Sequence, residues 1–238
     1  MVFILSIVFL VIRCDVKSDV GILLDSSGSV KVRGYQQEKD FIKKIVGAFQ
    51  LGEDKSRASV VTFSHLARLS IKFNQFYDQT SFDNAVDKIP YLGSWTRIDA
   101  ALRLAKSEMF KGSNGARRDV PNTLILLTDG AQNANGATDE EDPAKVAQEL
   151  RNSGVTIIAV GITDAPNERE LEKITGSPDN VFTASNFDTL ISDDFVRKLQ
   201  VKTCNTGEYF NNLPRKINFI GNVRFKLVVK NRRKKINL

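Results

Sequence analysis

Short apolar runs alternate with helical patterns along most of this 238-residue chain. Runs of strand length predict strands at residues 20–24, 58–63, 67–73, 123–127, 155–161 and 181–183. Apolar residues at helical spacing predict helices at residues 35–49, 82–89, 98–110, 144–150, 168–174 and 187–201. Asp142 is the expected N-cap of the helix at 144–150, with Pro143 at its first position. Central runs such as VGILL and TLILL are apolar on both faces, which indicates strands buried between two layers of helices.

The predicted fold is therefore α/β: a doubly wound (Rossmann-like), mostly parallel sheet with helices on both faces. The alternating runs 58–63 and 67–73 are separated by three residues, so they are predicted to form a hairpin that adds one antiparallel edge strand. A composition of 42% hydrophobic and 26% charged residues is typical of a globular domain with one core of about 200 residues. In such folds ligands bind beyond the carboxyl ends of the strands.

The N-terminal residues 1–13 are predicted to be a signal peptide or a hydrophobic N-terminal segment. Met1 to Ile12 is apolar apart from Ser6, and this run is too short to span a membrane as a helix. No basic residue precedes the run, and no small-residue cleavage site precedes Arg13. A buried first strand or an incomplete N-terminus therefore stays open as an alternative.

The chain contains two Cys and one His, which excludes a Cys-rich zinc framework and catalysis that needs several imidazoles. Cys14 stands just before the first strong strand, and Cys204 just after the last helix of the predicted domain, residues 14–204. If the chain is secreted and its domain ends lie close together, these two residues are expected to form a disulfide. Two buried thiols are the alternative.

The net charge of +6 is concentrated at the C-terminus. Residues 205–238 contain nine Lys and Arg and one acid, Glu208, whereas the rest of the chain is close to neutral. We interpret this segment as a basic tail or the start of a further module. It would suit a contact with glycosaminoglycans, and we expect no nucleic-acid partner.

Hydroxyl and carboxyl side chains gather where three loops are expected to meet at one edge of the sheet. DSSGS follows VGILL, Thr128-Asp129-Gly130 follows TLILL, and Thr96 lies in the loop that opens the helix at 98–110. Any one of these residues could be a helix cap or a turn residue. Together they offer only hard oxygen donors, which suit Mg²⁺, and Mn²⁺ or Ca²⁺ would fit the same donors. The predicted metal ligands are Asp25, Ser27, Ser29, Thr96 and Asp129.

DSSGS, the loop of Thr96 and LLTDG resemble the metal-ion-dependent adhesion site (MIDAS) of von Willebrand factor type A (vWA) domains. The resemblance covers about residues 18–202 and includes AALRLA, IIAVGI and FDTL. It implies that the three hydroxyls bind the ion, that the two carboxylates bind it directly or through water, and that the site is intact. It also implies that a partner's Glu or Asp completes the coordination. Because Cys204 would tether the last helix, the chain resembles matrix members such as collagens and matrilins more than the switchable integrin members.

These features predict a non-enzymatic, secreted adhesion module of the extracellular matrix. Its partner would be a matrix or cell-surface protein that presents a Glu or Asp to the bound cation. One alternative is a structural vWA interaction domain that binds partners independently of metal. Another is a Mg²⁺-dependent haloacid-dehalogenase-like phosphatase, although Ser27 occupies the position where that chemistry needs a second Asp.

Four further features carry weaker expectations. The acidic stretch Asp139–Asp142 is either a second cation site or the acidic start of a helix, which the helix dipole favours. His65, between the hairpin strands, is expected to be solvated, and Phe182 and Phe187 are expected to belong to the core.

Overall fold

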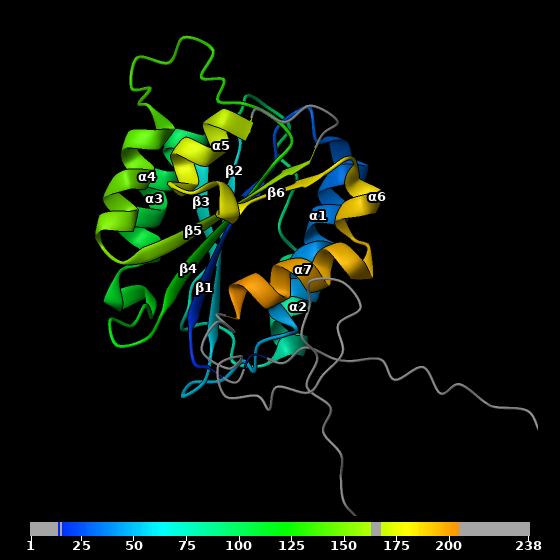
Figure 1. The fold of residues 1–238 in the computed structure, drawn as a ribbon, viewed down its shortest axis with the longest axis vertical. Coiled ribbons are helices and arrows are strands. Elements are labelled where there is room, and N and C mark those ends of the chain that lie inside the picture. Colours follow the sequence, from blue (N-terminus) through cyan, green and yellow to red (C-terminus); the bar gives the residue numbers. More distant parts are fainter. Residues whose placement is uncertain (1–13, 15, 163–167, 205–238) are drawn as a thin grey trace, which may run out of the picture. The chain divides into compact units, whose positions relative to one another are not determined.

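The computed structural model describes residues 14, 16–162 and 168–204, all within the unit Met1–Cys204. In this part of the chain six strands form one sheet, in the order β3-β2-β1-β4-β5-β6 (Figure 1). The strands are β1 (Asp19–Asp25), β2 (Arg57–Phe63), β3 (Ala67–Ile71), β4 (Asn122–Thr128), β5 (Val155–Ile162) and β6 (Val181–Ala184). All neighbours are parallel except β2 and β3, which form the antiparallel hairpin. The predicted mostly parallel sheet with one antiparallel edge strand is confirmed.

Helices cover both faces of the sheet (Figure 1). One face carries α3 (Ile98–Leu104), α4 (Pro143–Asn152) and α5 (Glu168–Thr175), and the other carries α1 (Lys31–Val46), α2 (Gln79–Asp87), α6 (Phe187–Leu190) and α7 (Asp193–Thr203). A π-helical turn, Ala105–Met109, continues α3, and Gly112–Asn114 and Pro178–Asn180 are 3₁₀ turns. Each face has its own hydrophobic core, so the doubly wound prediction is also confirmed.

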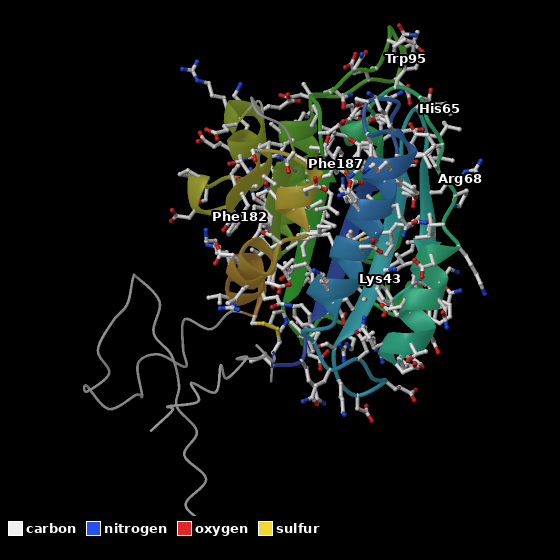
Figure 2. The ribbon with its side chains drawn as sticks, turned by 90° about the vertical axis from the view of Figure 1, so that its right-hand side faces the viewer. Lys43, His65, Arg68, Trp95, Phe182 and Phe187 are labelled. Atoms are coloured by element: carbon white, nitrogen blue, oxygen red, sulfur yellow. A yellow bond between two sulfur atoms is a disulfide. The ribbon has the colours of Figure 1, made fainter. Side chains whose placement is uncertain are left out.

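The helix expected at 187–201 is two helices, α6 and α7. The side chain of Asn186 caps α6, and Ser192 caps α7 by accepting a hydrogen bond from the backbone N–H of Phe195 at 3.3 Å. Ser192 followed by two aspartates is a helix-start signal that the apolar periodicity hides. Phe182 and Phe187 pack against the core as expected (Figure 2).

Strand β1 lies at the centre of the sheet, and all seven of its residues are buried. From β1 the chain adds β2 and β3 on one side and then crosses to β4 on the other side. The point where the strand order reverses therefore lies between β1 and β4, where open α/β sheets bind ligands. Asp25 ends β1, and Asp129 directly follows β4, so both carboxyl groups are placed at this position.

Cys14 and Cys204 form a disulfide, as predicted, with their Cα atoms 5.0 Å apart. The bond joins the chain just before β1 to the C-cap residue of α7, across 190 residues of sequence.

The predicted signal segment at 1–13 and the basic segment at 205–238 lie outside the described residues. Among the described helices, none has the length and apolar character needed to cross a membrane.

We expect the double variant Cys14→Ser/Cys204→Ser to lose about 5 kcal/mol of unfolding free energy, because the disulfide restricts the unfolded chain over a very long loop. Guanidinium denaturation of the oxidised wild type and the variant measures this difference. An unchanged midpoint would contradict a stabilising role for the bond.

Candidate functional site

Four of the five predicted ligands form a continuous hydrogen-bonded group at the carboxyl ends of β1 and β4. The backbone N–H of Ser27 donates to Asp25 Oδ1 at 2.8 Å, and the hydroxyls of Ser27 and Ser29 lie 3.1 Å apart. The Ser29 hydroxyl donates to Asp129 Oδ1 at 2.8 Å. Asp25 and Ser27 are buried, whereas Ser29 is exposed and Asp129 is half-buried. The group therefore extends from the sheet to the surface.

The loop of Thr96 reaches this group through backbone contacts. Gly28 N–H donates to the carbonyl of Ser94, and Gly93 N–H donates to the carbonyl of Ser26, both at 2.8 Å. On its other side, the carbonyl of Thr96 accepts a hydrogen bond from Asn133 N–H at 2.8 Å, which ties it to the segment after Asp129. The structure thus joins all three predicted loops.

Helix capping does not explain Ser29 or Thr96. The N-cap residues of α1 and α3 are Val30 and Arg97, and neither cap involves a side-chain hydrogen bond. Neither hydroxyl therefore serves a helix end: that of Ser29 belongs to the hydrogen-bonded group, whereas Thr96 is tied to the neighbouring loops through its backbone carbonyl.

Burial, with a smaller contribution from the charge of Asp129, raises the pKa of Asp25 to about 7, against the lowering effect of hydrogen bonds from Thr128 and Ser27. Burial also raises the pKa of Asp129. Thr128, which the sequence reasoning missed, donates its hydroxyl to Asp25 Oδ2 at 2.7 Å. The sequence signal for a role of Thr128 at the site was its position directly before Asp129.

The other two buried aspartates have arginine partners. Arg117 Nη2 lies 2.6 Å from Asp19 Oδ1, and Arg97 Nε lies 2.8 Å from Asp99 Oδ1. No described Lys, Arg or His forms an ion pair with Asp25 or Asp129. The two carboxylates of the site therefore lack a positive charge that the protein supplies to its other buried aspartates.

The donor set suits a hard divalent cation. The described residues contain no group of three or more His, Cys, Asp or Glu side chains that could hold a metal. The hydrogen-bonded group has two carboxylates and the hydroxyls of Ser27 and Ser29, and Thr96 on the adjoining loop would add a third hydroxyl. All are oxygen donors of the kind that Mg²⁺, Mn²⁺ and Ca²⁺ accept. It has neither the nitrogen nor the sulfur ligands of a structural zinc site.

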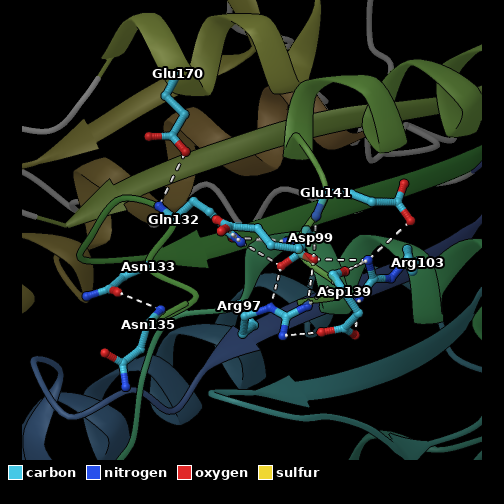
Figure 3. Close-up of polar contacts among 10 residues, drawn as sticks. Arg97, Asp99, Arg103, Gln132, Asn133, Asn135, Asp139, Glu141 and Glu170 are labelled. Atoms are coloured by element: carbon cyan, nitrogen blue, oxygen red, sulfur yellow. Dashed lines mark hydrogen bonds and ion pairs between the residues drawn. The ribbon is translucent and has the colours of Figure 1, made fainter. Parts of the chain in front are cut away.

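A buried ion pair supports the loop of Thr96 (Figure 3). Arg97 makes a two-pronged contact with Asp99, with Nε and Nη2 each 2.8 Å from one carboxylate oxygen. Gln132 Nε2 donates to Asp99 Oδ1 at 2.6 Å, and Asp99 N–H donates back to Gln132 Oε1 at 3.2 Å. Asp99 thereby connects Arg97, next to Thr96, with Gln132 in the loop that follows Asp129. The sequence reasoning missed this pair.

The acidic stretch at 139–142 faces arginines. Arg97 Nη1 and Arg103 Nη2 donate to the carboxylate of Asp139 at 3.0 and 3.2 Å, and Arg103 also bonds Glu141 (Figure 3). Asp142 caps α4, with its side chain accepting from Ala144 N–H at 2.9 Å. These contacts favour the helix-start interpretation over a second cation site.

Residues 19–197 match the family model of the von Willebrand factor type A domain. The chain belongs to the vWA family. Its vWA domain is 38% identical to mouse (Mus musculus) collagen alpha-6(VI) over 185 residues, which are 76% of this chain and 8% of that protein. It is 30% identical to cuticlin-6 of Caenorhabditis elegans over 172 residues, 72% of this chain and 28% of that one. The chain thus spans only a small part of these relatives.

Solved structures of proximal thread matrix protein 1 from the mussel byssus share the fold of the vWA domain. One has a TM-score of 0.74 at 30% identity and covers 81% of this chain and 48% of that one. Another, described as having a zinc-occupied MIDAS motif, has a TM-score of 0.72 at 30% identity and covers 82% and 47%. These relatives are matrix proteins rather than enzymes, which agrees with the prediction of a non-enzymatic module.

Glu38 is another buried acid of the vWA domain that sequence reasoning missed. It lies on α1, is fully buried, and neither of its carboxyl oxygens bonds a described residue. Burial raises the pKa of Glu38 well above its ordinary value of 4.5, and the charges of Asp25 and Asp129 raise it further. The signal was present in the sequence, because Glu38 falls on the same helical stripe as the core residues Tyr35, Phe41 and Ile42.

We expect Asp99→Asn to destabilise the vWA domain by about 3 kcal/mol near neutral pH, because it leaves the buried Arg97 with only the exposed Asp139 as a charge partner. Although burial alone would raise it, hydrogen bonds from Arg97 and Gln132 lower the pKa of Asp99 to about 2. The stabilisation that the ionised Asp99 gives the wild type should therefore be present above pH 4 and be lost as the pH falls toward 2. Urea denaturation across this pH range measures both effects. Glu149→Gln is the control, because it removes one partner of an exposed ion pair, Lys106 and Glu149.

We expect Glu38→Leu to raise the free energy of unfolding by about 1–3 kcal/mol near neutral pH, because it removes a buried polar group without partners. Since folding raises the pKa of Glu38, the folded state holds a proton that the unfolded chain releases above pH 4.5. The free energy of unfolding of the wild type should fall as the pH rises above 4.5, and that of the variant should fall less. Equal pH dependence of the two would contradict this account.

Proposed function

We propose that the vWA domain binds a protein of the extracellular matrix or cell surface through a divalent cation held by Asp25, Ser27, Ser29, Thr96 and Asp129. The observation that carries this proposal is the pair of carboxylates, Asp25 and Asp129, which are connected through Ser27 and Ser29 and form no ion pair with a cationic side chain among the described residues. A divalent cation bound there would supply the missing positive charge and accept a carboxylate from a partner.

The residues of the site have distinct roles in this proposal. Asp25 and Ser27 are buried at the end of β1, so they hold the inner side of the ion in a fixed position. Ser29 and Asp129 are more exposed, so they bind on the side from which a partner approaches. Thr96 is held between Ser94 and Asn133 by the contacts described above, and the ion pair of Arg97 and Asp99 keeps its loop in place.

Several observations support a matrix role and secretion. The relatives include collagen VI chains, cuticlin-6 and a byssal thread matrix protein. The disulfide fits an oxidising compartment. The zinc-occupied motif of the byssal protein supports a divalent cation at the corresponding place without deciding which one. Mg²⁺ is our first choice because every donor is a hard oxygen atom.

Trp95 provides a direct reporter for the cation. It is the only tryptophan of the chain, it precedes Thr96, and its side chain is half-exposed. We expect Mg²⁺, added to protein stripped with EDTA, to change the tryptophan fluorescence in a saturable way. Asp25→Ala should abolish the change, and Ser29→Ala should weaken the affinity roughly tenfold or more.

Ser113→Ala is the matched control for Ser29→Ala, because Ser113 is equally an exposed serine but lies before the start of β4, at the other edge of the sheet. Binding of the wild type to immobilised matrix proteins, with and without EDTA, completes the test. Saturable Mg²⁺ binding together with EDTA-sensitive adhesion supports the proposal. Adhesion that is indifferent to EDTA would favour a vWA domain that binds partners without metal.

A further inference from the structure

The dipeptide Asn-Gly occurs twice in the chain, at Asn114-Gly115 and at Asn135-Gly136. In this dipeptide the backbone nitrogen of the glycine can attack the side-chain carbonyl carbon of the asparagine, because glycine has no Cβ to obstruct the approach. The two copies share the same local chemistry. A difference in their reactivity would therefore come from the fold around them.

Asn135 and Gly136 lie at the tip of an exposed turn in the loop between β4 and α4. Their φ angles are 49° and 75°, and Ala137 N–H closes the turn by donating to the carbonyl of Ala134 at 3.0 Å. Two left-handed central residues are the pattern of a type I′ turn. The backbone N–H of Asn135 donates to Asn133 Oδ1 at 3.1 Å (Figure 3).

The two groups that would react in this turn are both accessible. Within the described part of the chain, neither the side-chain amide of Asn135 nor the backbone N–H of Gly136 forms a hydrogen bond. A Cβ placed on Gly136 would have no described atom within 4 Å, so the turn has open space around it. The asparagine can therefore rotate toward the glycine nitrogen without displacing a neighbour.

Asn114 and Gly115 are held in the opposite way. Asn114 is buried, and its Nδ2 donates to the carbonyl of Glu108 at 2.9 Å. Gly115 N–H donates to the carbonyl of Gly112 at 3.0 Å. A Cβ placed on Gly115 would lie 2.5 Å from the backbone nitrogen of Asn74, so the chain is closely packed there. Reaction at this dipeptide requires local opening of the structure first.

We propose that Asn135 is a site of spontaneous deamidation in the folded vWA domain. The nitrogen of Gly136 loses its proton and bonds to Cγ of Asn135, and the side-chain nitrogen takes up a proton and leaves as ammonia. Water then opens the resulting five-membered imide at one of its two carbonyl carbons. Opening at Cγ gives aspartate. Opening at the main-chain carbonyl gives isoaspartate, in which the main chain runs through Cβ and Cγ.

The product differs from the original loop in charge and in length. A neutral amide becomes a carboxylate, which adds one negative charge between β4 and α4. The isoaspartate form also adds one atom to the main chain between Asn133 and Ala137. The reaction consumes only water, so this inference does not depend on cation binding or on the proposed function.

The test is incubation of the full oxidised chain near neutral pH at physiological temperature for several weeks, followed by tryptic peptide mapping. Cleavage after Lys and Arg separates the two dipeptides into peptides 112–117 and 119–145. We expect the peptide 119–145 to gain the mass of an amide-to-acid conversion, which tandem mass spectrometry assigns to residue 135. Asn135 should convert at least about tenfold faster than Asn114, because Asn114 must first lose its hydrogen bonds. A sample that has not been incubated gives the background.

The chain reduced and unfolded in guanidinium is the matched control, in which Asn114 and Asn135 should convert at similar rates. In the folded protein Gly136→Ala should slow the conversion, because a Cβ obstructs the attacking nitrogen. Equal conversion of Asn114 and Asn135 in the folded protein, or conversion at Asn133 in place of Asn135, would overturn the proposal. A preference for Asn135 that persists in the unfolded chain would also overturn it, since the fold would then not be the cause.

Discussion

The central constraint in this structure is the unbalanced negative charge at the end of the central strand. Asp25 is fully buried, Asp129 is close enough to raise its pKa, and only hydroxyl and amide groups donate to the two carboxylates. Burying an ionised carboxylate is costly unless an opposite charge compensates it. The protein supplies arginines to Asp19 and Asp99 but not to this pair. Such selective omission is what a binding site for an exchangeable cation requires.

The fold creates this arrangement through strand order. Because β1 and β4 are parallel neighbours, their carboxyl ends meet at the same edge, and the next residues of both strands face each other across the switch point. The loops are fixed to one another by backbone hydrogen bonds and by the ion pair of Arg97 and Asp99. The disulfide at the opposite end of β1 fixes the C-terminus of α7. The site therefore rests on loops that are tied to one another and to the sheet.

The strands and the site loops could be predicted because their signals are local. VGILL and TLILL are apolar on both faces, and the oxygen-rich loops follow them directly in the sequence. The break at Ser192 was missed because the apolar spacing of α6 and α7 continues across it. Asp99 and Arg97 were missed for a different reason: their partners, Gln132 and Asp139, are distant in sequence and brought close only by the fold.

Exposure likewise could not be predicted. Trp95 and Leu66 fall in predicted loops, but only the packed structure shows that these large apolar side chains remain at the surface. Glu38 shows the opposite case, a charged residue type that the fold buries. Both departures from the usual hydrophobic pattern lie near the proposed cation site or are influenced by its charges, which is where functional demands are expected to override local rules.

The most direct test of the central claim is a crystal structure of the protein soaked with Mn²⁺, in which anomalous scattering locates the ion. The account predicts one strong peak bonded to the hydroxyls of Ser27 and Ser29 and near Thr96, Asp25 and Asp129, with one coordination position taken by water or a carboxylate from a neighbouring molecule. A crystal that contains Mn²⁺ elsewhere but none between Asp25 and Asp129 would contradict it.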